Sequence, residues 1–462
     1  MSATLALGLF LQACAVVVMV RGRRRRTATG IGLMFVAMAV VYHGVTEILQ
    51  LTVQSYSDNR LLTTDSNVAA YTVLVGFSLL AFAAVYQAVA LRGPARMVLD
   101  REGIANFFEW KLLSLVALFA VAVSAAGKGF GASVEAKSEI TGSPYLVGGF
   151  ATQFLDISLT LGSFAILVRT KGRGLFVVLF VQCAIHTLTG QRSSVPISAG
   201  MVIYLLSLVG IRARRWESVS IVVLVVLSYL VIGGARADFG REALWYGSGV
   251  DRRLTALGAG LAHPERGISR SGIGDLGVRL DGNSFPSIIL QRLEHGASPI
   301  GPVTLGDDLR IAVPRFLQPG KLNSDESSRS LKLRLCEVYG ITTEFDRLPT
   351  QLGELLPVGG PVWMVFLAGV WGFLLASLER ILLGCCHPAG LLGILGVAVG
   401  TLQYSGGFGF IVICVRSAIA LAIVLLGWRM LRAAWKGRLR TFWKGASGVV
   451  DTSRPRRLWP AK

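Results

Sequence analysis

Long apolar runs separated by short polar segments dominate the hydrophobic pattern of the chain. A helix that crosses a bilayer needs about 20 mostly apolar residues, so each run is a candidate transmembrane helix. The pattern therefore predicts an all-α, polytopic membrane helix bundle with eleven spans, of which the sixth, seventh and tenth are the shortest. In chain order the runs are residues 3–20, 30–50, 67–91, 104–126, 147–168, 175–190, 195–211, 217–233, 357–378, 389–403 and 407–428.

The first run has the flanks of an uncleaved anchor. No basic residue precedes it, whereas Arg21 and the four arginines at 23–26 follow it at once. A secretory signal peptide has the opposite arrangement, with its positive charge before the apolar run. We therefore expect the N-terminus to lie outside the membrane.

Composition excludes an ordinary cytosolic enzyme, because 53% of the residues are hydrophobic and only 16% are charged. The formal net charge is +19, from 46 Lys and Arg residues against 27 Asp and Glu residues. With the N-terminus outside, the inner segments hold more than half of these cations, as the positive-inside rule requires. The short outer loops hold only Arg60, Lys128, Lys137 and Arg192. The basic excess is therefore a topology signal, and no nucleic-acid partner is expected.

Four regions follow from this topology. Residues 1–233 hold the first eight transmembrane helices, and residues 357–428 hold the last three. Residues 429–462 form a basic cytoplasmic tail, in which aromatic and cationic residues alternate as in a stretch that lies on the inner membrane surface. Between spans 8 and 9 lies one large extracytoplasmic loop, residues 234–356, in which we expect short helices over the outer mouth of the bundle.

The large loop is the main indication of function, since connections longer than about 15 residues are usually functional or disordered. It holds equal numbers of basic and acidic residues. Arginine has planar, permanently charged donors that match phosphate oxygens. Each such residue also has a simpler interpretation, as a solvated or salt-bridged side chain. The candidates for binding a diphosphate are Arg236, Arg241, Arg310, Arg315 and Lys321 in the loop, and Arg192 in the short turn between spans 6 and 7.

Polar residues inside the predicted spans form a second group. His43 and Glu47 lie at the outer end of span 2, and Gln182 lies in span 6. Ionisable residues at membrane depth usually face the protein interior and pair. Asp156 in span 5 and Arg416 in span 11 are the complementary pair, either structural or catalytic, and His186 in span 6 is either a proton relay or an interior histidine.

Cysteine chemistry adds no cofactor. The six cysteines are scattered and predict no disulfide framework. Cys385, Cys386 and His387 are adjacent, but they lack a fourth ligand at a usable spacing for zinc. We therefore expect no metal and no cofactor.

The layout resembles the Wzy-type O-antigen polymerase and oligosaccharide repeat-unit polymerase family. The shared features are ten or more spans, a short outer turn with Gly-x-Arg-Ser character, and one long outer loop late in the chain. These motifs are short, although the layout covers most of the chain. The residues concerned are Gly190, Arg192 and Ser193, the stretch from Pro314 to Lys321, Gly353-Glu354, Gly359-Gly360 and Leu378-Glu379-Arg380.

The resemblance implies a metal-independent membrane glycosyltransferase at the outer face of the bacterial cytoplasmic membrane. Such an enzyme polymerises undecaprenyl-diphosphate-linked oligosaccharide repeat units into a surface polysaccharide, and a chain-length regulator is a candidate partner. On this hypothesis Arg192, Arg315 and Lys321 bind the diphosphate and stabilise its leaving charge. His295 and Glu354 are the candidates for the proton acceptor.

Three alternatives stay open at this point. A glycan ligase, which transfers finished polysaccharide to an acceptor, has the same layout. A transporter of lipid-linked oligosaccharide is less consistent with the chain, because no internal repeat relates its halves. A polyprenol-phosphate-sugar transferase typically carries acidic residues in its first outer loop, where this chain has Asp58 and Asp65.

Overall fold

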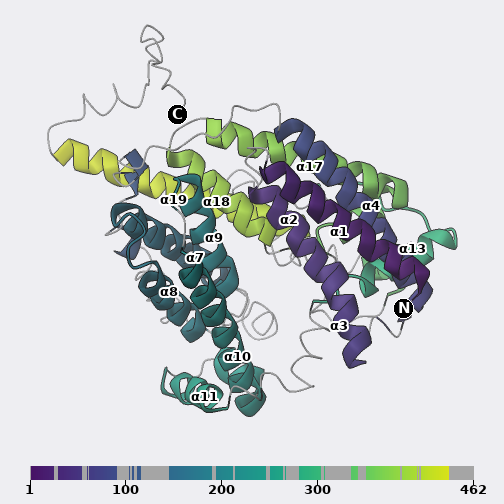
Figure 1. Cartoon of the computed structure of the whole chain (residues 1–462), viewed down its shortest axis with the longest axis horizontal. Helices are drawn as coiled ribbons and strands as arrows, with labels where there is room; N and C mark the ends of the chain where they lie inside the picture. Colours follow the sequence, from purple (N-terminus) through teal and green to yellow (C-terminus); the bar gives the residue numbers. More distant parts are fainter. Residues whose placement is uncertain are drawn as a thin grey trace, which may run out of the picture. The chain divides into compact units, whose positions relative to one another are not determined.

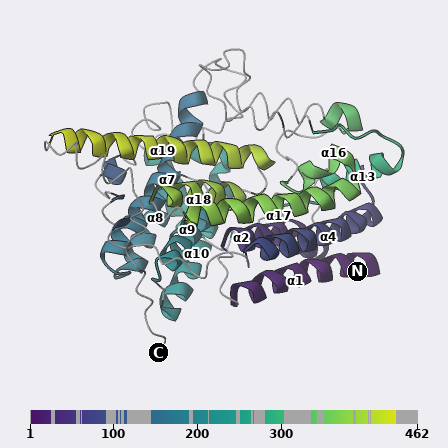
Figure 2. The same ribbon diagram turned by 90° about the horizontal axis from the view of Figure 1, so that it is seen from above.

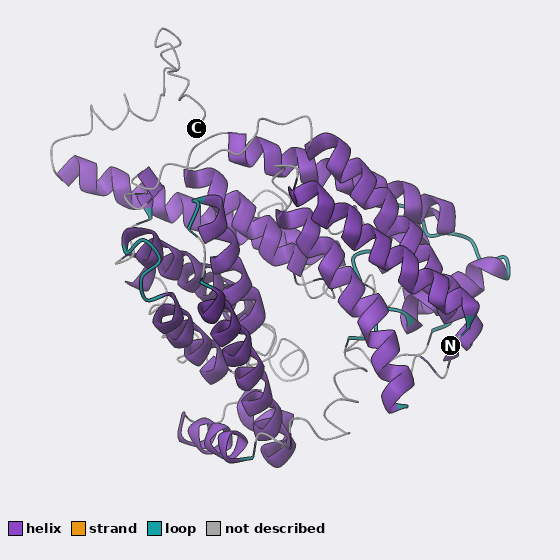
Figure 3. Cartoon of the chain, viewed as in Figure 1, coloured by secondary structure: helices purple, strands orange, loops and turns teal. Residues whose placement is uncertain are grey.

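Over the residues that it describes, the computed structural model consists of helices and connecting loops, with no strand (Figure 3). Two compact units are present, Met1–Ala418 and Ile419–Lys462. The described residues are 2–24, 30–54, 60, 62–90, 103–104, 107–108, 112–115, 145–189, 194–211, 214–245, 250–263, 266, 280–302, 306, 335–341, 350–384, 388–402, 404 and 407–435.

Most of the described helices fall on the predicted apolar runs (Figure 1). Each run has a counterpart except residues 104–126, which lie largely outside the described residues. The helices are α1 (Ala3–Arg24), α2 (Gly30–Val40), the π-helical turn η1 (Val41–Val45), α3 (Thr46–Val53), α4 (Asp65–Ala90), α7 (Tyr145–Arg169), α8 (Leu175–Thr189), α9 (Ser194–Leu208), α10 (Arg215–Trp245), α11 (Val250–Ala262), α13 (Ser284–Glu294), η5 (Gly353–Leu355), α16 (Leu356–Gly359), α17 (Pro361–Gly384), α18 (Pro388–Leu402) and α19 (Gly407–Trp435).

Six helical segments of the described chain are long and apolar enough to cross a membrane, which indicates a multi-pass membrane protein. Three further apolar helices are shorter, at Leu175–Thr187, Val195–Leu208 and Gly390–Leu402. The total of eleven spans stays a prediction. The six long segments are Ala3–Gly22, Gly30–Thr52, Asp65–Ala90, Trp216–Ala235, Pro361–Gly384 and Cys414–Arg432.

Helix α4 is the centre of the N-terminal packing, with α1 and α17 along it (Figure 2). Small residues allow these close contacts, as is usual between membrane helices. A β-carbon on Gly76 of α4 would lie 2.6 Å from Leu11 Cβ of α1, and one on Gly372 of α17 would lie 2.6 Å from the Phe82 carbonyl oxygen. The backbones of α1, α4 and α17 are therefore packed at distances that only glycine permits.

The helices from α7 through α11 form a second group, held together by contacts between neighbouring helices. Helix α7 packs on α8 and α9, α10 packs on α8, and α11 packs on α10. Helices α10 and α11 meet where Gly234 faces Gly260. A β-carbon added to Gly260 would lie 2.2 Å from the Val231 carbonyl oxygen. Helix α10 continues without a break to Trp245, twelve residues beyond the predicted end of span 8 at 233. The segment predicted as a loop therefore begins with a helix hairpin.

The rest of the predicted loop contains further described helical pieces. Helix α13 packs on α4 and α16, and a helical turn begins at Leu335. The turn η5 and helix α16 then lead into α17. These pieces bring the 281–302 and 350–360 segments to the end of the bundle where α2–α3 ends and α4 begins.

Candidate functional site

A π-helical turn interrupts the second candidate span in the middle of its course. Residues Val41–Val45 form η1 between α2 and α3, and Thr46 reaches back to Val41, donating both its backbone N–H and, at 2.8 Å, its hydroxyl to the Val41 carbonyl oxygen. Such turns inside α-helices are often found at functional sites. His43 lies within this turn and is fully buried.

His43 joins three separate parts of the chain. Its Nδ1 lies 2.8 Å from Asn283 Oδ1, and its Nε2 lies 3.1 Å from the Tyr404 hydroxyl and 3.3 Å from Thr350 Oγ1. The Asn283 amide nitrogen donates to the His43 carbonyl oxygen, so its Oδ1 accepts from the ring. This pattern assigns the ring proton to Nδ1 and leaves Nε2 as the acceptor for the two hydroxyl groups.

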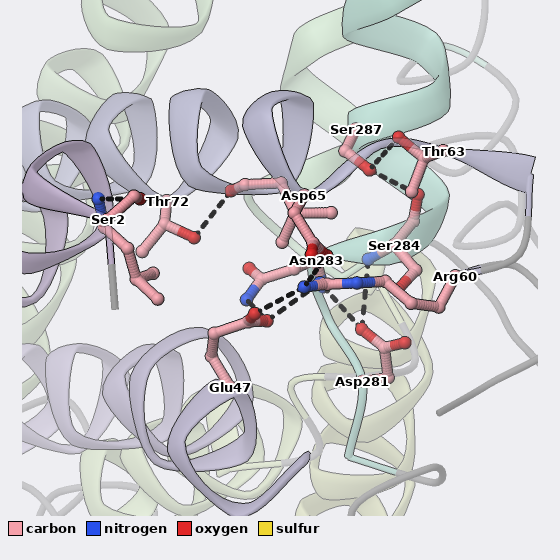
Figure 4. A network of polar contacts seen from close by, with 12 residues as sticks. Ser2, Glu47, Arg60, Thr63, Asp65, Thr72, Asp281, Asn283, Ser284 and Ser287 are labelled. Carbon is pink, nitrogen blue, oxygen red and sulfur yellow. Dashed lines mark hydrogen bonds and ion pairs between the residues drawn. The ribbon is translucent and has the colours of Figure 1, made fainter. Parts of the chain in front are cut away.

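Glu47 lies one turn beyond His43 and carries the charge of the cluster. Arg60 donates to both of its carboxylate oxygens, at 3.1 and 2.8 Å, and Asn283 Nδ2 donates to Oε2 at 3.3 Å (Figure 4). Arg60 also donates to Asp65 at 2.9 Å. Burial by itself lowers the pKa of the Arg60 guanidinium, but Glu47 and Asp65 outweigh burial and hold that pKa above its usual value. The Arg60 guanidinium therefore stays charged beside Glu47. We call His43, Glu47, Arg60, Asn283, Thr350 and Tyr404 the His43 cluster.

The turn that begins α13 fits closely against the π-helical turn. Asp281 Oδ1 accepts the backbone N–H groups of Asn283 and Ser284, at 3.1 and 3.0 Å, and so orients the start of the helix. Gly282 donates its N–H to the Tyr42 carbonyl oxygen. A β-carbon on Gly282 would lie 2.9 Å from the His43 ring, so only glycine allows this approach.

The 350–354 turn is fixed to the cluster from the other side. Thr350 Oγ1 accepts the Gly353 N–H at 3.1 Å, and Gln351 donates its N–H to the Tyr404 carbonyl oxygen. Glu354 is 5% exposed, and its Oε2 accepts the backbone N–H of Phe408 at 2.8 Å. This carboxylate therefore lies at the N-terminus of α19, where a negative charge is favourable.

The other candidates from the loop have different surroundings. His295 is exposed directly after α13, with its Nδ1 2.6 Å from the Gln291 carbonyl oxygen, and it is not a member of the His43 cluster. Arg236 and Arg241 lie on the extension of α10. The remaining candidates, Arg192, Arg310, Arg315 and Lys321, lie outside the described residues, as does the Cys385–His387 triplet.

Asp156 and His186, two of the intramembrane polar residues, face each other between α7 and α8. Asp156 Oδ1 lies 3.4 Å from His186 Nδ1, between α7 and α8, and Gln182 and Thr160 make a further contact between these helices. The predicted pairing of Asp156 with Arg416 stays a prediction.

Another buried carboxyl group lies at the opposite end of α4. Glu379 of α17 is 2% exposed and accepts the hydroxyl groups of Tyr86 of α4 and of Tyr204 of α9, the latter at 2.8 Å. The backbone N–H groups of Gly30 and Ile31, at the start of α2, also face it. We call Tyr86, Tyr204 and Glu379 the Glu379 cluster. Its hydrogen bonds satisfy a carboxylate at membrane depth, which is the usual requirement for burying one.

No family model, curated protein or solved structure matches the chain. The site therefore has to be interpreted from its own geometry.

Sequence reasoning identified some members of the His43 cluster and missed others. His43 and Glu47 are predicted as polar residues inside an apolar run, and Glu354, which borders the cluster, is a candidate proton acceptor that the resemblance implies. Asn283 and Tyr404 were missed, because a neutral residue in a polar segment carries no signal in the pattern. Arg60 was used only for topology, although it is the one cation in the first predicted outer loop.

Proposed function

We propose that the chain is a bacterial cytoplasmic-membrane glycosyltransferase that polymerises undecaprenyl-diphosphate-linked oligosaccharide repeat units at the outer face. On this proposal the N-terminus is outside and the C-terminal tail is cytoplasmic. Support comes from the layout of spans and loop in the sequence and from the multi-pass helical fold. The observation that carries the proposal is the attachment of the large loop to the His43 cluster.

The described segments on both sides of the loop cations are packed against the rest of the protein. Ile300 donates its backbone N–H to the Pro357 carbonyl oxygen at 2.8 Å. On the other side of the segment, Leu335, Tyr339 and Ile341 are buried. Residues 303–334, with Arg310, Arg315 and Lys321, lie in the sequence between these two packed segments. This arrangement favours a role of these cations at the His43 end of the bundle.

The helix ends that meet in the His43 cluster all belong to the same predicted side of the membrane. The cluster joins the end of span 2, the start of span 3, the loop and the turn between spans 10 and 11. The positive-inside rule assigns all of these to the outer face. A lipid-diphosphate substrate that has crossed to that face meets the loop there.

The proposed reaction is a substitution at an anomeric carbon. A hydroxyl group of the acceptor repeat forms a new bond to that carbon on the growing chain, and the bond to the diphosphate oxygen breaks. Undecaprenyl diphosphate leaves with the electron pair, and the proton of the hydroxyl passes to a base. Arg192, Arg315 and Lys321 bind the diphosphate and stabilise the charge that develops on it. Glu354 is the better placed of the two base candidates, because it borders the His43 cluster.

The test is glycan chain length in the natural host. Cells that lack the gene are complemented with the parent chain, Arg192→Ala or Arg315→Ala, and the lipid-linked and acceptor-linked glycans are separated by size. Each variant is expected to leave single repeats on the acceptor. Arg292→Ala is the control, since Arg292 is an exposed arginine of α13. Normal polymer from both variants would remove the assignment, and undecaprenyl-linked polymer that is not transferred would indicate the ligase instead.

A further inference from the structure

Helix α11 has two apolar sides, of which only one is covered. Ala256 and Leu257 pack on Val231, Ile232 and Ala235 of α10, and Phe239 adjoins them. On the other side Leu254 and Leu261 are 51% and 69% exposed. These two leucines are seven residues apart, which places them on one face of the helix.

The position of α11 on α10 indicates what covers the exposed face of α11, which carries Leu254 and Leu261. Every fourth residue along one side of α10 is apolar and exposed, with Val219 at 64%, Val223 at 50% and Leu227 at 48%. The candidate span runs from Trp216 to Ala235, so this stripe is the surface that lipid covers. The next residue in the same series is Val231, which is buried by α11. Helix α11 therefore lies on the lipid-facing side of α10.

The depth of α11 follows from the glycine contact. Gly260 approaches the backbone at Val231 and Ala235, which lie inside the last turns of the candidate span. Leu261 is the next residue of α11, so it is at the same level.

We infer that α11 is a membrane-inserted element of the predicted outer loop, with Leu254 and Leu261 in contact with the acyl chains of the bilayer. The occupant of this surface is lipid because the exposed apolar stripe of α10 continues directly onto it. The inference does not depend on the proposed glycosyl transfer. It revises the boundary of the loop, since the segment returns to the membrane before it reaches the His43 cluster.

The test is site-specific photocrosslinking with p-benzoylphenylalanine in place of Leu254 or Leu261. The full-length protein is placed in vesicles of phosphatidylethanolamine and phosphatidylglycerol, and lipid adducts are measured by mass spectrometry after irradiation. Val223 is the matched lipid-facing control, and Glu294, exposed on α13, is the control for the loop. We expect lipid adducts at positions 254 and 261 with a yield close to that at position 223 and several-fold above that at position 294.

Two results would overturn the inference. One is a yield at both leucine positions as low as that at position 294, while position 223 gives adducts. The other is crosslinking of these positions to another segment of the chain. If the bulky side chain prevents folding, spin labels on Leu254→Cys and Leu261→Cys replace it, and higher accessibility to a water-soluble nickel complex than to oxygen would contradict lipid contact.

Discussion

At the scale of single residues, the His43 cluster depends on a few side chains that each have several partners. Asn283 is bonded to the ring and the carbonyl oxygen of His43 and to Glu47, and Arg60 neutralises the carboxylate. A buried charge is tolerated only when it is paired and hydrogen-bonded. The cost of removing one partner is therefore larger than the strength of a single contact.

Replacing Arg60 with methionine leaves the Glu47 carboxylate buried without its cation. We expect the free energy of unfolding to fall by about 3–5 kcal/mol, the range for breaking one side of a buried pair. Reversible unfolding of the purified protein in mixed micelles measures this. The double variant Arg60→Met with Glu47→Leu should recover part of the loss, and Arg292→Met should have little effect. Equal losses in the single and double variants would contradict the buried pairing.

Replacing Asn283 with alanine removes the link between α13 and the π-helical turn. The buried polar groups that lose a partner cost about 1–3 kcal/mol each, so the turn before α13 should open more often. Limited trypsin digestion should then cleave faster at arginines in the 264–280 segment, with intact helices elsewhere. Glu294→Ala, on the exposed side of the same helix, is the control. Unchanged cleavage in Asn283→Ala would show that Asn283 does not hold the loop.

At the scale of elements, the apolar runs predicted the helices well, because a bilayer span has a length that the sequence displays. The π-helical turn at Val41–Val45 had no such signal, since the hydrophobic pattern of a span does not distinguish a π-helical turn from α-helix. The extension of α10 was missed because the prediction ended where apolar residues ended, although the residues from 235 to 245 include good helix formers. The contacts of Asn283 and Tyr404 depend on tertiary packing, which a single sequence does not specify.

Gly372 tests the packing of α17 on α4. A β-carbon at this position would clash with the Phe82 carbonyl oxygen, so Gly372→Ala pushes the backbones of α17 and α4 apart. We expect the free energy of unfolding to fall by about 1–3 kcal/mol, as for overpacking. Thermal unfolding in detergent is the measurement. Gly384→Ala at the end of the same helix has nothing within 4 Å and should be neutral. An equal shift in both variants would argue against the close contact.

At the scale of the whole molecule, two buried polar clusters lie at opposite ends of α4. Asp65 is near its start beside Arg60, and Tyr86 is near its end beside Glu379. The predicted topology assigns the first end to the outer face and the second to the cytoplasmic face. The clusters therefore give the membrane orientation a concrete test.

Reporter fusions should separate the two faces. Alkaline phosphatase fused after Gly296, just beyond α13, should be active, because that enzyme folds only outside the cytoplasm. The same reporter fused after Gly172, in the turn between α7 and α8, should be inactive, whereas a green fluorescent protein there should fluoresce. The reverse pattern at both positions would invert the orientation and place the His43 cluster in the cytoplasm.

The helix from Gly30 to Val53 takes part in both clusters, through the N–H groups at its start and through His43 and Glu47 further along. A span that is fixed at two levels cannot slide along the membrane normal when the bilayer becomes thinner or thicker. It has to tilt or deform the surrounding lipid, at a cost that grows with each ångström of hydrophobic mismatch. Bilayer thickness is therefore expected to act on the geometry around His43, so the acyl-chain length of the host membrane becomes a variable of the protein's activity.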